Sequence, residues 1–295
     1  NFKKWGVEDG LADIDVKYIY IEDNNNIWIG TSFGVSVFNG SNFNIIHEYN
    51  NPYALNNSEV TSIQKSKDGI YFFGQDVRGV IVYDPSSLRN MKKADGVKNG
   101  NIGSIGYDKD NNLWISQWNG NGGIHRVENE QIVESINYED GLPTNQVFDF
   151  AFSSDGRMWI ATSNGLAVYD RNNKKIISYN KKDGLQNSNI RSVAIDQNDI
   201  VWCYTSSGLI RYDGESFTIY TQEDGLVRSR FNGDVNIDKK GNIIFSTYGS
   251  GFSIFDGKDF KNYDKSNGMV DGRIWDLAID SKNNYWLALD GSGVQ

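Results

Sequence analysis

The sequence repeats one unit of about 43 residues seven times, and this repetition limits the possible folds more than any other feature. The clearest copy spans residues 139–179. It contains four short runs in which apolar or aromatic residues alternate with polar ones, separated by turns such as Ser154-Asp155-Gly156 and Asn164-Gly165. Alternation with a period of two is typical of half-buried β-strands. We therefore predict that each unit forms four antiparallel strands.

Three markers in a fixed order define the repeat. The first is an acidic-Gly-apolar triplet, or a variant of it, whose central residue is Gly10, Ala54, Gly96, Gly141, Gly184, Gly225 or Gly268. The second is a strand motif that contains Trp28, Phe72, Trp114, Trp159, Trp202, Ile244 or Trp286. The third is a Gly-apolar pair that begins at Gly34, Gly79, Gly123, Gly165, Gly208, Gly251 or Gly293. Four-stranded repeats of this length are typical of β-propeller blades.

The sequence thus predicts an all-β fold, a single seven-bladed β-propeller over residues 1–295 with four-stranded antiparallel blades. The blades are expected to start near residues 10, 54, 96, 141, 184, 225 and 268. The segment that ends at Trp5 resembles the fourth strands that end at Tyr220 and Tyr263, and the chain stops within a third strand. We therefore expect residues 1–5 to form the outer strand of the last blade and to remove a free sheet edge.

Composition excludes several kinds of partner. The formal net charge is −9, and an acidic surface does not attract nucleic acid or an anionic membrane, so neither is expected as a partner. The single cysteine, Cys203, excludes an internal disulfide framework and a multi-Cys metal site. No apolar run is long enough to predict a membrane segment. Because the chain lacks an initiating Met and a signal peptide, we expect a trimmed mature protein or an excised domain.

The Asp-Gly-Leu start, the Trp-Ile-Ala-Thr second strand and the Gly-Leu third strand ending in Tyr-Asp all occur between Asp140 and Asp170. Together they resemble the two-component regulator propeller repeat. The resemblance implies a sensor domain of a bacterial hybrid two-component system that lies in the periplasm or outside the cell. It also implies an oligosaccharide or related nutrient as ligand, and a larger receptor whose further domains are not found among these residues.

The loops between blades and the loops between second and third strands are expected to share one face, around the central channel. Residues that depart from the repeat gather on this face in blades 2, 3, 6 and 7. The candidate ligand-binding residues are Arg78, Trp118, Arg228, Arg230, Tyr248, Arg273 and Trp275, with Arg191 on or near the same face. Because guanidinium groups bind carboxylates bidentately and aromatic faces stack on sugar rings, we predict an oligosaccharide or an anionic small molecule. The alternative is that the arginines form ion pairs with Asp9, Asp15, Glu59 and Asp271.

The sequence favours a non-enzymatic sensor over an enzyme. His47 and His125 are expected on outer strands away from the channel, which argues against similarity to the streptogramin lyases, propellers that depend on a channel-side histidine. Three first-strand aspartates offer groups for general acid–base chemistry, namely Asp149, Asp234 and Asp276. A polysaccharide lyase or glycosidase is therefore the alternative function. Since serines occupy the same repeat position in three blades, we interpret the aspartates as acceptors for backbone N–H groups.

No cofactor or metal site is predicted. The turn from Asp108 to Asn112 resembles the start of a calcium-binding loop, but it lacks the glycine and the closing glutamate of such a loop. Equivalent turns in other blades have the composition of ordinary hairpin turns. We therefore interpret the turn at Asp108 as structural.

Overall fold

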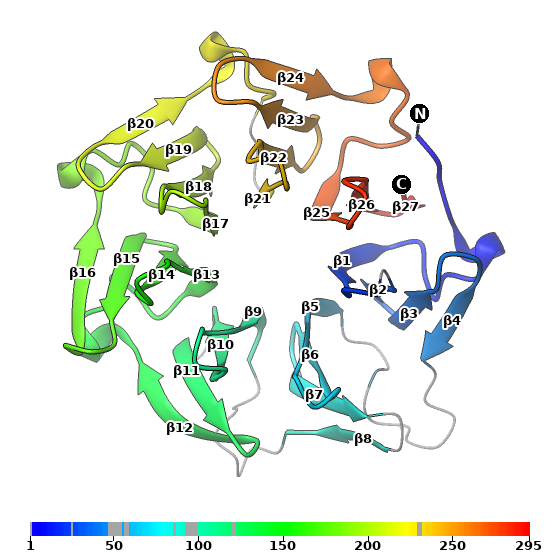
Figure 1. Ribbon diagram of the computed structural model, residues 1–295, viewed down its shortest axis with the longest axis horizontal. Coiled ribbons are helices and arrows are strands. Elements are labelled where there is room, and N and C mark those ends of the chain that lie inside the picture. Colours follow the sequence, from blue (N-terminus) through cyan, green and yellow to red (C-terminus); the bar gives the residue numbers. More distant parts are fainter. Residues whose placement is uncertain are drawn as a thin grey trace.

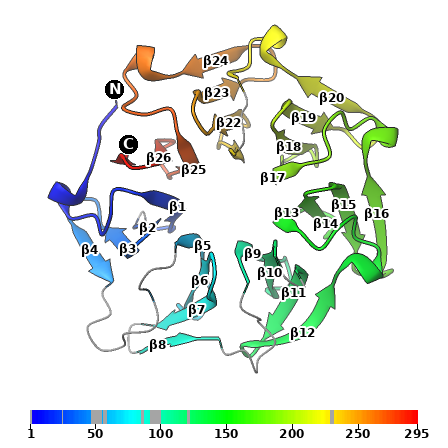
Figure 2. The same cartoon turned by 180° about the vertical axis from the view of Figure 1, so that it is seen from behind.

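The computed structural model describes residues 2–24, 26–46, 55, 59–84, 87–91, 100–119, 122–228 and 232–295. These residues form seven antiparallel β-sheets arranged as blades around a central axis (Figure 1). Seen from behind (Figure 2), strands such as β1, β5, β9 and β13 lie nearest the axis, and the fourth strands of the four-stranded blades lie at the periphery. The predicted seven-bladed β-propeller is confirmed.

The strands follow one another in chain order within each blade. Blades 1 to 3 consist of β1 (Val16–Ile21), β2 (Ile27–Thr31), β3 (Gly34–Phe38), β4 (Phe43–Ile46); β5 (Val60–Lys65), β6 (Tyr71–Gln75), β7 (Gly79–Asp84), β8 (Ser87–Asn90); and β9 (Ile102–Tyr107), β10 (Leu113–Gln117), β11 (Gly123–Glu128), β12 (Gln131–Ile136). Blades 4 and 5 consist of β13 (Val147–Phe152), β14 (Met158–Thr162), β15 (Gly165–Asp170), β16 (Lys175–Tyr179); and β17 (Ile190–Ile195), β18 (Val201–Thr205), β19 (Gly208–Tyr212), β20 (Phe217–Tyr220). Blades 6 and 7 consist of β21 (Val235–Ile237), β22 (Ile243–Thr247), β23 (Gly251–Phe255), β24 (Phe260–Tyr263); and β25 (Ile274–Ile279), β26 (Tyr285–Leu289), β27 (Gly293–Val294).

The acidic-Gly-apolar triplet starts a blade through one local structure, a 3₁₀ turn. In η4 (Lys181–Asp183), the Asn180 side chain accepts from Lys182 N, and the Asp183 carboxylate accepts from Asn180 N at 2.8 Å. Gly184 follows with φ of 104°, a left-handed conformation that favours glycine, and the next residue is buried in the core. A 3₁₀ turn followed by a left-handed glycine also occurs in η1 (Val7–Asp9), η3 (Tyr138–Asp140), η5 (Gln222–Asp224) and η6 (Lys265–Asn267). In η1 the N-cap residue is Gly6, which has no side chain to accept a bond, and in η6 the amide oxygen of Asn267 takes the place of the aspartate.

The N-terminal segment closes the last blade, as predicted. Trp5 N donates to Val294 O at 2.9 Å, and Val294 N donates to Trp5 O at 3.0 Å. The contact is a single antiparallel bridge beside β27, rather than a strand of five residues. The indole of Trp5 stacks on that of Trp286, with ring centroids 4.9 Å apart. Figure 1 shows the two chain ends side by side at this seam.

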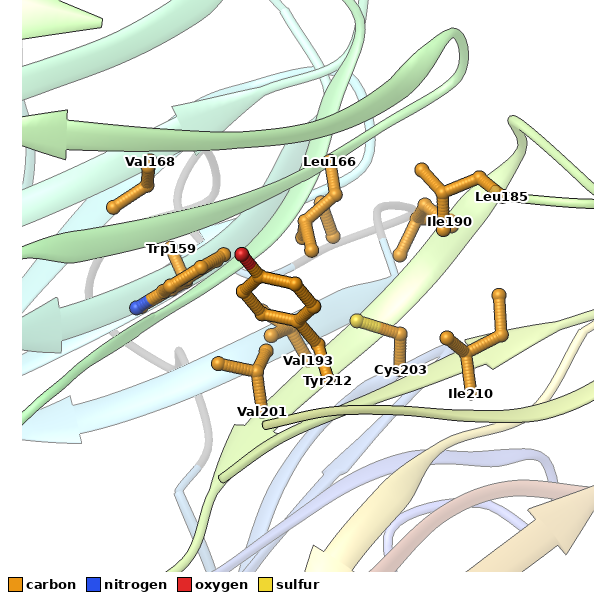
Figure 3. Packing of buried hydrophobic residues seen from close by; sticks show 11 residues of the cluster. Trp159, Leu166, Val168, Leu185, Ile190, Val193, Val201, Cys203, Ile210 and Tyr212 are labelled. Carbon is orange, nitrogen blue, oxygen red and sulfur yellow. The ribbon is translucent and has the colours of Figure 1, made fainter. Parts of the chain in front are cut away.

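The hydrophobic core lies between neighbouring blades. The described residues form seven buried clusters, one at each interface between two blades. Figure 3 shows the cluster between blades 4 and 5, where Trp159 and Leu166 of one blade face Cys203 and Tyr212 of the next. Burial raises the pKa of the Cys203 thiol, which makes it a core residue rather than a reactive nucleophile.

The aspartate-rich hairpin turns support the second-strand tryptophans. The indole N–H groups of Trp114, Trp202 and Trp286 donate to Asp108, Asp196 and Asp280 at 3.0, 3.1 and 3.2 Å. Asp108 also accepts from the backbone N–H groups of Asp110 and Asn112. These bonds show that the turn at Asp108 is a hairpin turn whose carboxylate holds an indole in place. This agrees with its interpretation from the sequence as a structural turn.

A β-bulge recurs in the first strands. The pairing of first and second strands shifts register at the third residue of the strand, for example between Val16 and Tyr18 in β1 and between Val147 and Asp149 in β13. In blade 6, β21 begins only at Val235, after the equivalent position. A bulge sets two residues of one strand against one of its partner and redirects a side chain. Two consecutive residues at this position lie beside the central axis in blades 1, 3, 4, 5, 6 and 7.

Candidate functional site

A cavity of about 930 Å³ occupies the centre of the ring, where the first strands meet. Its wall contains consecutive pairs of residues from the bulged strands, namely Lys17-Tyr18, Gly103-Ser104, Phe148-Asp149, Arg191-Ser192, Gly233-Asp234 and Trp275-Asp276. We call the first members, with Thr61 of blade 2, the mouth layer, and the second members, with Ser62, the inner ring. The mouth layer is nearer to the face on which the blades start.

The turns between second and third strands lie on that same face, as predicted. Ser32 N donates to Asp15 O at 3.0 Å, and Asp76 N donates to Glu59 O at 3.1 Å. Each bond joins such a turn to the segment that leads into the first strand of its blade. In blades 1 and 2, the two kinds of loop therefore meet at the channel mouth.

The aspartates of the inner ring connect neighbouring blades. Asp149 Oδ2 accepts from Val193 N of blade 5 at 3.0 Å, and Asp276 Oδ2 accepts from Ile19 N of blade 1 at 2.7 Å. Each of these carboxylates also accepts from the backbone N–H of the residue that follows it. The interpretation of these aspartates as acceptors for backbone groups is therefore confirmed.

Proton affinity is raised in the inner ring. Burial, with a smaller effect of the Asp234 charge, raises the pKa of Asp149 to about 6. Burial also raises the pKa values of Asp234 and Asp276, whose side chains hydrogen-bond to each other. Two carboxylates in contact repel each other when both are ionised, and this repulsion favours the protonated form of the pair.

One half of the mouth layer is neutralised by its own ion pairs. The Lys17 ammonium lies 3.1 Å from Asp15 and 3.3 Å from Glu59, and only 9% of its side chain is exposed. It also lies 4.4 Å above the ring of Trp275. Burial alone would lower the pKa of Lys17, but the two carboxylates outweigh it and raise that pKa. Trp275 therefore presents an aromatic surface backed by a compensated cation.

The other half of the mouth layer is aromatic and cationic. The Arg191 guanidinium lies 4.0 Å above the ring of Phe148, and the ring of Trp118 lies 6.4 Å from that of Phe148. Trp118 is in the turn between β10 and β11, so this wall is built by blades 3, 4 and 5. Glycines occupy the mouth layer in blades 3 and 6, where a Cβ atom would come within 2.2 Å of Phe148 O and of Ser246 O, respectively.

Asp290 joins three of the predicted site residues. Its carboxylate accepts from Tyr248 Oη at 2.6 Å, from Arg273 Nη1 at 2.7 Å and from Trp275 Nε1 at 3.2 Å. Arg273 also pairs with Asp271 at 2.9 Å. The group therefore fixes the orientation of the Trp275 indole at the cavity wall.

Replacing Asp290 with alanine is expected to lower the free energy of unfolding by about 2 kcal/mol, because three partly buried donors lose their acceptor. Urea denaturation monitored by tryptophan fluorescence measures this loss. The control is Asp259→Ala, since the Asp259 side chain is 77% exposed on an outer turn. Equal stability of the two variants would show that the Asp290 bonds contribute nothing.

The structure brings some of the sequence-predicted residues together and leaves others apart. Trp118 and Trp275 line the cavity, and Tyr248 and Arg273 adjoin it through Asp290. Arg78 and Arg228 are exposed and do not line the cavity. Arg230 and His47 lie outside the described residues, as do the blade starts predicted near residues 54 and 96.

The alternative that the rim arginines form ion pairs is correct for Arg273, which pairs with Asp271. Asp15 and Glu59 instead pair with Lys17, and Asp9 accepts from Gly6 N in the 3₁₀ turn. The mouth-layer residues Lys17 and Phe148 were not predicted. In the sequence, each of them comes immediately before the inner-ring residue of its repeat. That position indicates a channel residue only when the bulge is taken into account.

Two further features lie away from the cavity. His125 is buried on β11 and bonds Ser135 through Nδ1 at 2.9 Å. In the described ranges, no group of three or more His, Cys, Asp or Glu side chains is arranged to hold a metal ion. The helices found in the described part of the chain are single 3₁₀ turns, and none could span a membrane.

Comparisons with known proteins agree with this architecture. Residues 141–164 match the family described as two component regulator propeller. No match was found among curated proteins. Among solved structures, the extracellular domain of BT3049 from B. thetaiotaomicron, assigned to the hybrid two component systems, is similar with a TM-score of 0.83 at 22% identity. That similarity covers 97% of this chain and 39% of the other.

The extracellular domain of BT4673 from the same organism, assigned in the same way, has a TM-score of 0.76 at 20% identity over 95% of this chain and 37% of its own. The chain thus spans about two fifths of these two relatives. Virginiamycin B lyase from Staphylococcus aureus has a TM-score of 0.74 at 13% identity, over 95% of this chain and 94% of the lyase. At such identities the comparisons establish a shared fold.

Proposed function

We propose that this chain, which belongs to the two-component regulator propeller family, is the ligand-sensing propeller of a larger receptor in the periplasm or outside the cell. It binds an oligosaccharide or an anionic small molecule at the channel mouth without transforming it. Trp118 and Trp275 contact the ligand, Tyr248 and Arg273 hold Trp275 in place, and the arginines of the surrounding loops, Arg78, Arg228 and Arg230, attract acidic groups.

The observation that most supports this proposal is the cavity of about 930 Å³ with Trp118, Phe148 and Trp275 in its wall. Ligand sites are concave, carry aromatic surface and contain a few polar groups that fix orientation. The fold shared with extracellular domains of proteins assigned to hybrid two component systems supports a sensing role. Against catalysis, the inner-ring carboxylates are engaged by backbone N–H groups and by one another.

The test is a thermal-shift screen against neutral and acidic oligosaccharides, followed by chemical analysis of each ligand that binds. A ligand at about 100 times its dissociation constant adds roughly 2.7 kcal/mol, which corresponds to a rise in Tm of about 5 °C. Recovery of the intact ligand supports a sensor. Cleavage of the ligand would instead support the lyase or glycosidase alternative.

Trp118→Ala is expected to weaken binding of such a ligand by about 10-fold or more, because the variant loses a stacking surface at the mouth. Isothermal titration calorimetry measures the change. Tyr138→Ala serves as the control, since Tyr138 is 65% exposed in η3 at the outer edge of the propeller. If both variants bind as tightly as the native protein, the ligand does not contact the mouth at Trp118.

A further inference from the structure

We infer that the Arg191 side of the channel mouth is an anion subsite, which receives a single carboxylate carried on the ring of the ligand. This inference rests on the proposed function and narrows its ligand to the class of ring monocarboxylates, such as sugar acids. It adds Arg191 and Phe148 to the predicted site residues.

Arg191 lacks the ion pair to a carboxylate that most of the described arginines form. Within the described residues, ion pairs to carboxylates at 3.5 Å or closer hold Arg126, Arg157, Arg171, Arg211 and Arg273. Arg191 is partly buried in the cavity wall, and no carboxylate of the described residues lies within ion-pair distance of it. Its Nε is buried without a hydrogen-bond partner.

A partly buried cation without a counter-ion is unfavourable, because burial removes water from the charge and the Phe148 ring replaces only part of that hydration. Burial lowers the pKa of Arg191, as this environment requires. An incoming carboxylate would replace the lost hydration with charge-assisted hydrogen bonds. The binding energy of the ligand therefore includes relief of an unfavourable state in the free protein.

The surroundings of Arg191 suit a carboxylate attached to a ring. Stacking at 4.0 Å on Phe148 uses a face of the guanidinium and leaves its N–H edge for an acceptor. Phe148 and Trp118 extend the wall on one side with aromatic surface on which the apolar face of a ring can lie. The cation that would bind the carboxylate and the aromatic surface that would contact the ring therefore lie side by side in one wall of the cavity.

The rest of the cavity limits the ligand to one negative charge. Lys17, the other cation of the mouth layer, is already paired with Asp15 and Glu59. The inner ring below contains Asp149 and the Asp234–Asp276 pair, whose negative potential disfavours an anion deeper in the channel. A polyanion would meet these carboxylates, whereas a monocarboxylate can place its charge on Arg191 at the mouth.

The experiment uses the whole chain with 5-fluorotryptophan, and ¹⁹F NMR follows the Trp118 resonance, assigned with Trp118→Phe. The probes are glucuronate and galacturonate. The control ligands are glucose and galactose, which lack the carboxylate. We expect the acids to shift the Trp118 resonance in a saturable manner and the neutral sugars to have no effect. Absence of any shift that depends on the carboxylate would overturn the inference.

Arg191→Gln is expected to weaken binding of the acids by about 10-fold or more, since the charge-assisted bonds are lost. It is expected to fold, because Arg191 has no ion pair to lose, and the native ¹⁹F pattern checks this. The matched control is Arg211→Gln, on the third strand of the same blade, paired with Asp213. Equal affinity of Arg191→Gln and the native protein for the acids would overturn the subsite.

The outcomes separate this inference from the proposed function. If neutral oligosaccharides shift the Trp118 resonance equally in the native protein and in Arg191→Gln, the mouth binds ligands but the anion subsite is wrong. If the acids bind but the Trp118 resonance does not move, the ligand lies elsewhere, and both the subsite and the proposed location fail.

Discussion

Replacing Trp5 with alanine is expected to lower the free energy of unfolding by about 3 kcal/mol, the lower end of the range for loss of a large aromatic side chain from a core. Trp5 is half-buried, and it stacks on Trp286 at 4.9 Å and contacts Phe38 at 5.7 Å. It thereby joins the last blade to the first. Because the hydrogen bonds at this seam join distant ends of the chain, loss of the seam weakens two blades together.

Urea denaturation measures this effect, and the repeat itself supplies the control. Tyr179 and Tyr220 stack on Trp159 and Trp202 at the position that Trp5 occupies against Trp286. Trp5→Tyr should therefore retain most of the stability. Val7→Ala, at a residue that is 51% exposed just beyond the bridge, should change little. The seam would be unimportant if Trp5→Ala unfolded at the same urea concentration as Val7→Ala.

The sequence was sufficient to predict the fold because each marker of the repeat has a local physical role. The aspartate and glycine of the triplet form a capped turn, as in Asp183 and Gly184, and such turns depend on few neighbours. The match of Trp5 to the fourth strands of other blades predicted the closure of the ring. Both features depend on spacing along the chain, and spacing is what a repeat makes visible.

The site was only partly predictable, because it depends on contacts between blades. Strict alternation places one of two neighbours on each face of a strand, so Phe148 and Asp149 were not expected to line the channel together. The bulge in β13 alters that rule. Asp290 lies between β26 and β27, 17 residues after Arg273, and its carboxylate accepts from the Arg273 guanidinium. No sequence motif marks Asp290 as an acceptor. Arg78 and Arg228 were chosen for their loops, but the orientation of a loop side chain does not follow from its position in a repeat.

The inner ring has a consequence for stability, because three carboxylates are buried in it. We expect the protein to become more stable as the pH falls from about 7 to about 4, as far as Asp149 is concerned. Its pKa is raised from 3.8 to about 6 in the folded state, so the folded state binds more protons than the unfolded state between these values. Stability linked to this group is therefore present at low pH and is lost as the pH rises through about 6. The difference in pKa corresponds to at most about 3 kcal/mol.

Asp149→Ser isolates this contribution, because the chain already uses serine at the equivalent position of blade 5. Ser192 Oγ accepts from Val235 N of the next blade at 3.4 Å, so a serine at position 149 can accept from Val193 N without carrying a charge. The variant should exceed the native protein in stability by up to about 3 kcal/mol at pH 7 and match it near pH 4. Urea denaturation across this range measures both curves.

The difference between the two curves matters more than either curve alone, because other carboxylates act in the opposite direction. Hydrogen bonds outweigh burial and lower the pKa values of Asp108 and Asp280, so their contribution is lost only as the pH falls below about 4. These groups are the same in both proteins and cancel in the difference. Glu139→Ser removes an exposed charge from the same blade and should follow the native curve. If Asp149→Ser also runs parallel to the native curve, Asp149 is ionised in the folded protein without cost, and the inner ring is hydrated rather than sealed by the blades.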